Sequence, residues 1–238
     1  MRLLIIMTLI FLQFLILNKS AVAQDEDYSE EEYAESYAAW MFEASYTLFD
    51  PINTFGRAVE GAKSGFNISV LKQAKPGSDM FFGLSGYYTQ LGNDVQENVT
   101  SQGEAVDDIA SSNVLGFDFT LRYYPDLVFG IVEPFVEAHL GTRFYYTITK
   151  SYFPVFDETI DYRANETNSS LAYGFGLGTH VVIDESWALN FKCSYQLANI
   201  ARYYVENGEN NVDPLENFDL EFSSTDWIRY DIGVSFIF

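Results

Sequence analysis

The most regular feature of the chain is an alternation of apolar and polar side chains with a period of two. It is clearest in the last stretch, WIRYDIGVSFIF at 227–238, where one row of alternate residues is apolar throughout. That row consists of Ile228, Tyr230, Ile232, Val234, Phe236 and Phe238, and the second row includes Arg229, Asp231 and Ser235. Because successive side chains of a β-strand point to opposite sides, this period predicts a strand with two different faces.

Seven earlier segments carry the same pattern. They span residues 40–48, 66–70, 80–88, 115–123, 136–148, 171–183 and 187–197. The chain also holds 17 Tyr and 21 Phe, which are residue types that favour strands. We therefore expect an all-β protein of about eight amphipathic strands.

The connections between these segments alternate in length. The short ones are 73–78, 125–132 and 184–186, and the long ones are 49–64, 92–111, 151–168 and 206–224. Short turns at one end and long loops at the other are typical of a transmembrane antiparallel up-and-down β-barrel. Aromatic pairs at strand ends, such as Tyr123-Tyr124, Tyr145-Tyr146 and Tyr203-Tyr204, are typical of the girdles at membrane interfaces. A soluble β-domain of the periplasm is the alternative interpretation.

The first 23 residues have the layout of a secretory signal peptide. Arg2 precedes an apolar run over 3–17, and the segment closes on the small residues of Ala21-Val22-Ala23. The run is shorter than the ~20 residues of a spanning helix. Residues 24–37 hold seven acids and no base, which predicts a solvated tail. We therefore divide the chain into a signal peptide (1–23, cleaved near Ala23), an acidic tail (24–37) and a β-barrel (38–238).

The signal peptide, the eight amphipathic strands and the aromatic last strand together resemble the small eight-stranded outer-membrane barrels of Gram-negative bacteria. The resemblance covers about residues 38–238 and is to the porin-like or OmpA- and OmpX-like group common in Bacteroidetes. It implies location in the cell outer membrane, with outer-membrane lipid and lipopolysaccharide as neighbours. It also implies that Tyr230, Phe236 and Phe238 form the signal that the barrel-assembly machinery recognises.

The second face of each strand predicts what fills the barrel. Its charged residues are the acids Glu43, Asp118, Glu137 and Asp231 and the bases Arg122, Arg143, Lys192 and Arg229, joined by His139 and His180. A buried charge without a partner is costly, so a matched set predicts ion pairs across a narrow lumen. Eight strands enclose a space that side chains can fill. We expect a largely plugged, charge-balanced lumen and a structural or interaction role, with a narrow porin-like channel for small solutes or ions as the alternative.

The formal net charge of −21 makes nucleic acid an unsuitable partner, because phosphates are bound by Lys and Arg. The 92–111 and 206–224 connections carry acids and no base, which keeps exposed loops soluble. The same carboxylates are ligands suited to divalent cations, although no calcium-loop spacing is present. The sequence predicts no cofactor. Its single cysteine, Cys193, lies in an apolar row and is interpreted as a small hydrophobic residue.

An envelope enzyme that modifies lipid A is a further alternative. Some eight-stranded barrels of that kind carry a His followed two residues later by a Ser on one strand. Here the residue two positions after His139 is Gly141, and the residue two positions after His180 is Val182, so that motif is absent. We therefore expect no catalytic role.

Overall fold

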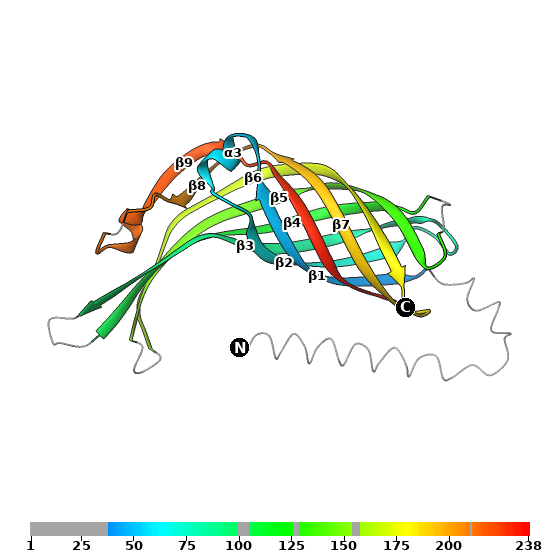
Figure 1. The fold of residues 1–238 in the computed structure, drawn as a ribbon, viewed down its shortest axis with the longest axis horizontal. Helices are drawn as coiled ribbons and strands as arrows, with labels where there is room; N and C mark the ends of the chain where they lie inside the picture. Colours follow the sequence, from blue (N-terminus) through cyan, green and yellow to red (C-terminus); the bar gives the residue numbers. More distant parts are fainter. Residues whose placement is uncertain (1–37, 100–104, 126–128, 154–157, 210) are drawn as a thin grey trace. The chain divides into compact units, whose positions relative to one another are not determined.

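The computed structural model describes residues 38–99, 105–125, 129–153, 158–209 and 211–238. The predicted signal peptide and acidic tail lie outside these residues. Eight strands form a closed antiparallel barrel in the order β1-β10-β7-β6-β5-β4-β3-β2, and β8 and β9 form a separate two-stranded sheet (Figure 1). The eight-stranded up-and-down barrel predicted from the sequence is confirmed.

The barrel strands are β1 (Trp40–Pro51), β2 (Lys63–Gln73), β3 (Met80–Val99), β4 (Ala105–Tyr123), β5 (Val132–Phe153), β6 (Glu158–Val182), β7 (Trp187–Ala198) and β10 (Trp227–Ile237). The other elements are α3 (Asn53–Ala58), β8 (Ile200–Glu206), the 3-10 helix η2 (Pro214–Asn217) and β9 (Phe218–Ser224). Within the described part of the chain, no helix is long and apolar enough to cross a membrane.

The last strand closes the barrel against the first. β10 pairs with β1 from Met41 opposite Ile237 to Pro51 opposite Trp227. The Phe238 amide donates to the Trp40 carbonyl at 2.9 Å, and the Trp40 amide donates to the Phe238 carbonyl at 2.7 Å. This closure leaves neither strand with an unpaired edge, which is the condition for a sheet in lipid.

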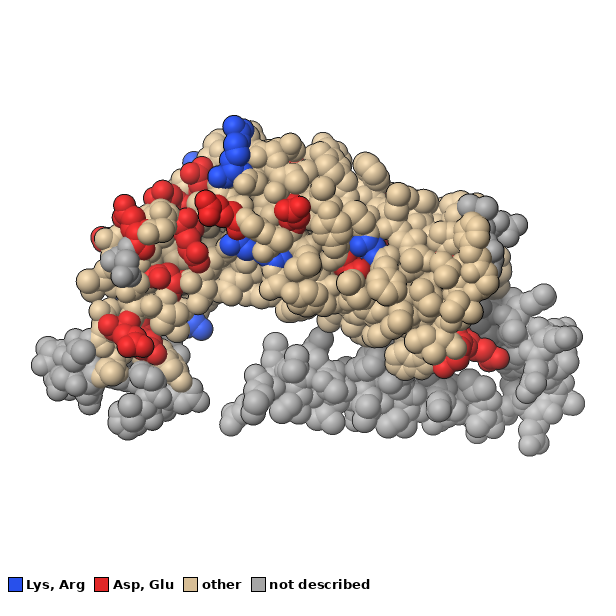
Figure 2. All heavy atoms as spheres, viewed as in Figure 1, with Lys and Arg blue, Asp and Glu red and all other residues tan. Residues whose placement is uncertain are grey.

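Apolar and polar side chains are divided between the outer and inner faces of the strands as the alternation predicts. Every barrel strand exposes large apolar side chains outward, and Leu84 is 67% exposed although it lies midway along the barrel part of β3. Representative residues, one from each strand in chain order, are Tyr46, Phe66, Leu84, Phe117, Leu140, Phe175, Phe191 and Ile232. Acidic side chains gather instead at the end that carries β8 and β9 (Figure 2). The surface is apolar where the strands pair into the barrel, and the buried face is polar.

The predicted long loops differ from the structure in one respect. Most of 92–111 and 151–168 is strand, because β3 pairs with β4 as far as Val99 opposite Ala105, and β5 pairs with β6 as far as Phe153 opposite Glu158. These extensions are rich in Asn, Ser, Thr and acids, so they lack the apolar row that marks the barrel segments. A strand beyond the lipid needs no apolar outer face, and the alternation therefore fades while the pairing continues.

The connection between β7 and β10 folds back over the same end of the barrel as α3. Phe55 in α3 meets Tyr203 in β8 edge-on at 5.0 Å between ring centroids, and it lies 6.2 Å from Trp227. These rings belong to a buried apolar cluster at the end of the barrel that carries α3 and β8, and this cluster is named here the outer cluster. Its members are Phe49, Phe55, Val59, Tyr87, Leu91, Val114, Tyr145, Ala201, Tyr203, Val205 and Trp227.

Candidate functional site

Like His180, the nine other residues that the sequence assigns to the lumen network are buried in the structure, each at most 6% exposed. They come from five strands. They are Glu43 of β1, Asp118 and Arg122 of β4, Glu137, His139 and Arg143 of β5, Lys192 of β7, and Arg229 and Asp231 of β10. Their side chains fall into three groups along the barrel axis, which differ in chemistry.

The first group is organised by the Arg122 guanidinium. Its Nη1 and Nη2 each donate to one oxygen of Glu43 at 2.7 Å, and its Nε donates to Glu137 Oε1 at 2.7 Å. The guanidinium also lies 4.1 Å from the ring centroid of Phe135. A bidentate carboxylate pair on one side, a second carboxylate and an aromatic face satisfy a buried arginine almost completely.

The strands that carry these partners show whether the ion pair crosses the lumen. Arg122 lies in β4 and Glu43 in β1, and two strands, β3 and β2, separate them along the wall. The ion pair therefore crosses the lumen instead of following the wall. His180 of β6 reaches the same carboxylate, with Nε2 3.1 Å from Glu43 Oε1, and it too comes from three strands away.

His180 also contacts two residues that the sequence did not single out. Ser235 Oγ lies 3.1 Å from His180 Nε2, and the Tyr124 hydroxyl lies 3.0 Å from His180 Nδ1. A serine, a histidine and a glutamate thus meet, but Ser235 and Glu43 both face the same imidazole nitrogen. A nucleophilic relay needs the serine and the acid on opposite nitrogens. This arrangement suits a hydrogen-bonded support for Glu43.

The second group surrounds Arg229 and Asp231. Arg229 Nε donates to Asp231 Oδ2 at 3.1 Å, and its Nη1 lies 3.8 Å from Asp118 Oδ2. Lys192 Nζ lies 3.8 Å from Asp231 and 3.5 Å from Glu43, so it connects this group to the first.

Arg143 forms the third group without a carboxylate. Its Nε donates to the Tyr87 hydroxyl at 3.1 Å and its Nη2 to Gln196 Oε1 at 3.0 Å. Its Nη1 donates to the Thr225 carbonyl, and the guanidinium stacks 3.7 Å from the Trp227 ring centroid. Charge counting predicts an ion pair for every base, yet within the described residues Arg143 makes none.

His139 is held against the first group, with Nε2 3.3 Å from Glu137 Oε2 and Nδ1 3.3 Å from Thr120 Oγ1. Other buried polar atoms in the lumen face have no hydrogen-bond partner among the described residues. They are Asn67 Oδ1, the Tyr145 hydroxyl, Ser170 Oγ, Ser194 Oγ, and both terminal nitrogens of Arg229. Buried groups of this kind are normally satisfied by water.

The residues assigned to the assembly signal lie in the outward row of β10 and just after it. Tyr230 and Phe238 are 43% and 45% exposed, and the rings of Phe236 and Phe238 stack 5.4 Å apart. The Trp187 ring lies 4.8 Å from Phe236. Cys193 is exposed on the neighbouring strand, as its place in an apolar row predicts.

The acidic connections hold no metal-binding arrangement in the part of the chain that the structure describes, because no three Asp, Glu, His or Cys residues are grouped there. Several of the carboxylates join the outer segments to one another. Asp108 accepts from Ser151 at 2.5 Å, Asp94 accepts from Asn217 at 2.7 Å, and Glu206 accepts from the Asn93 amide at 2.6 Å.

No protein-family model and no curated protein sequence matches the chain. Solved structures with a similar chain path do exist. The outer membrane protein OprG of Pseudomonas aeruginosa is 15% identical, with 86% of this chain and 97% of that chain covered and a TM-score of 0.46. A major outer membrane protein of Thermus thermophilus is 13% identical, with coverage of 84% and 99% and a TM-score of 0.47.

The attachment invasion locus protein Ail of Yersinia pestis, solved in complex with the heparin analogue sucrose octasulfate, is also similar. It is 14% identical, with coverage of 85% and 99% and a TM-score of 0.38. At these identities the likeness concerns the fold alone.

Proposed function

We propose that the protein is an integral outer-membrane β-barrel that does not conduct and that has a structural or interaction role. Two features support the membrane location. Large apolar side chains cover the outside of all eight barrel strands, and the charged side chains lie inside. A soluble barrel would place these two classes of side chain the other way round. Outer-membrane lipid and lipopolysaccharide are the neighbours that such a surface fits.

The observation that carries the non-conducting role is the ion pair across the lumen. Arg122 joins Glu43 and Glu137, and the three side chains span from β4 to β1 and β5. A second obstruction is supported at the end covered by α3 and β8, where Trp227 of the outer cluster stacks on the Arg143 guanidinium. A continuous path for ions would have to break both layers.

The interaction role is supported by the strand extensions. β3 with β4 and β5 with β6 continue far past the last pairs that β2 and β7 make with the barrel. They present a polar, acidic surface beyond the apolar region. We further propose that Tyr230, Phe236 and Phe238 are read by the assembly machinery during insertion. Divalent cations form no part of the proposal, because the described residues supply no ligand set.

Recording in planar bilayers tests the non-conducting role. The refolded barrel is expected to insert, as measured by protease protection in vesicles, and to give no steady current at moderate voltage. A stable ohmic current that scales with salt concentration would overturn this proposal.

A narrow, hydrated channel is the second candidate, and one observation favours it. Arg229, Asn67 and Ser194 have buried polar atoms without hydrogen-bond partners among the described residues, and such atoms call for water within the lumen. If these groups line a conducting path, the Arg229→Gln variant should change the ion selectivity of the current. If the lumen is sealed, this variant should be as silent as the natural protein.

A further inference from the structure

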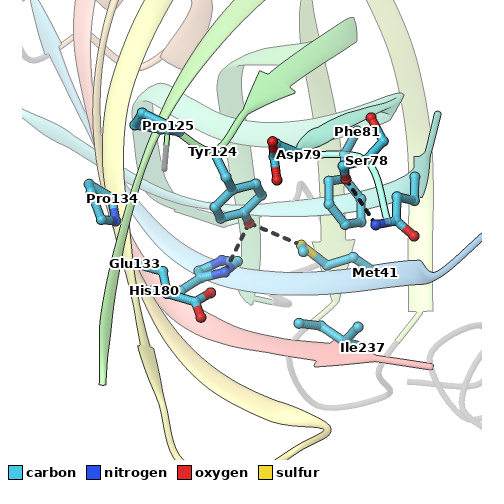
Figure 3. Close-up of a pocket in the computed structure, with 11 residues that line it drawn as sticks. Met41, Ser78, Asp79, Phe81, Tyr124, Pro125, Glu133, Pro134, His180 and Ile237 are labelled. Carbon is cyan, nitrogen blue, oxygen red and sulfur yellow. Dashed lines mark hydrogen bonds between the residues drawn. The ribbon is translucent and has the colours of Figure 1, made fainter. Parts of the chain in front are cut away.

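A pocket of about 250 Å³ opens at the end of the barrel where β1 begins and β10 ends. Its walls come from the start of β1, from the β2–β3 turn, and from the ends of β4 and β6 with the start of β5. The inner end of this space borders the lumen network, because His180 contacts Glu43 and the Arg122 guanidinium donates to the Tyr124 hydroxyl at 3.1 Å. Figure 3 shows that the pocket is bounded by Tyr124, His180 and Met41 on one side, with Phe81 and Asp79 beside them.

The inner wall of the pocket is mostly aromatic, and its side chains contact one another. The Tyr124 hydroxyl is held by His180 Nδ1 at 3.0 Å and lies 3.8 Å from Met41 Sδ. The Phe81 ring meets the Tyr124 ring edge-on at 5.6 Å between centroids, and Phe135 packs on the other side at 5.6 Å. These groups offer apolar contact for a hydrocarbon stem and ring faces for a cation.

Two carboxylates stand at the same pocket. Asp79 precedes β3 and is exposed, while Glu133, near the start of β5, is half-buried opposite His180 in the β5–β6 register. Within the described residues neither carboxylate takes part in a salt bridge, although every acid of the lumen network does. Their charge is therefore available to a ligand.

We propose that this pocket receives one basic side chain, a lysine or arginine, from a partner peptide. The stem packs against Phe81 and Tyr124, and the cationic head lies between Asp79 and Glu133. That the partner is periplasmic rests on the proposed function, because the outer-membrane orientation places this end of the barrel in the periplasm. The pocket's preference for a basic side chain does not depend on that orientation.

Nuclear magnetic resonance on the purified protein in a nonionic detergent micelle tests the proposal. The probes are the acetylated and amidated tripeptides Ala-Lys-Ala, Ala-Arg-Ala and Ala-Gln-Ala. The two basic peptides should shift the Met41 methyl and Tyr124 amide signals in a saturable manner. A dissociation constant of about 1 mM is expected for a single-side-chain site. Equal shifts with the glutamine peptide, or no saturable shift with either basic peptide, would overturn the proposal.

Paired variants locate the binding charge. Replacement of both carboxylates, Asp79→Asn with Glu133→Gln, should weaken the basic peptides at least tenfold. Glu185→Gln removes an exposed carboxylate from the turn before β7, outside the pocket, and should change the affinity less than twofold. Unchanged affinity in the double variant would refute the site. Heat-modifiable gel mobility verifies folding of each variant. The peptide affinities are measured in micelles, so they test the pocket independently of whether bilayer recordings show that the barrel conducts.

Discussion

Arg122→Met removes the cation that joins Glu43 and Glu137, and it tests the lumen network most sharply. Arg122 is fully buried, and its guanidinium satisfies both oxygens of Glu43 and one of Glu137. Methionine fills much of the same volume without a charge. After the replacement, Glu43 keeps Lys192 at 3.5 Å and Glu137 keeps His139 at 3.3 Å, which are weaker partners than the lost guanidinium.

The expected cost follows from the two carboxylates left behind. Removing one partner from a buried ion pair costs about 3–5 kcal/mol, because the remaining charge stays desolvated. We expect a loss in that range for Arg122→Met, equivalent to a change of about a hundred- to several-thousandfold in the unfolding equilibrium. The triple variant Arg122→Met, Glu43→Gln, Glu137→Gln removes all three charges together. It should recover most of the loss, because no uncompensated charge remains.

Urea unfolding in lipid vesicles, followed by tryptophan fluorescence, measures both variants. Arg163→Met is the matched control, since Arg163 pairs with Asp161 at 2.9 Å but the two side chains are 75% and 50% exposed. An exposed pair is worth about 0–1 kcal/mol, so the control should change little. The reasoning is refuted if Arg122→Met costs no more than Arg163→Met, or if the triple variant is less stable than Arg122→Met alone.

Three further variants, the last with a matched control, probe other parts of the molecule. Trp227→Ala empties the fully buried centre of the outer cluster and should cost about 3–5 kcal/mol in the same unfolding assay. Gly116→Ala would place a methyl group against the Tyr87 ring, so it should cost about 1–3 kcal/mol and shift the Tyr87 resonances. Leu84→Arg puts a charge on the apolar outer surface of the barrel and should lower the free energy of unfolding in vesicles by about 2–4 kcal/mol. Val212→Arg, which lies outside the barrel strands, should lower it by almost nothing.

The period-two alternation predicts the eight strands and the two faces of each, and the alternating lengths of the connections add the barrel. A strand in lipid must present apolar side chains on every second residue, so the inward row follows directly from the outward row. Glu43 and Arg229 could be placed inside on this basis alone. The same rule placed Cys193 and Tyr230 outside, where the structure has them.

The pairing of lumen charges could not be predicted. Which residue reaches across the lumen depends on the stagger of strands around the ring, and the alternation carries no information about stagger. Arg143 shows the consequence, because its partners are Tyr87, Gln196 and the ring of Trp227, which charge counting ignores.

The strand extensions and the β8–β9 sheet were also missed, for a different reason. Beyond the lipid, polar residues are tolerated on the outer face, so a segment such as 93–98 reads as loop although it pairs regularly with β4. Tyr203-Tyr204 was interpreted as a girdle at a barrel strand end. It belongs instead to β8, where Tyr203 packs into the outer cluster.

The claim on which the account depends is that the outward apolar row contacts lipid. Spin labels attached through cysteine at Leu84 and, separately, at Val212, both in a Cys193→Ser background, test it in vesicles. The label at Leu84 should collide readily with oxygen and rarely with a water-soluble nickel complex, and the label at Val212 should show the opposite preference. Equal access of the nickel complex to both positions would contradict the membrane-spanning barrel.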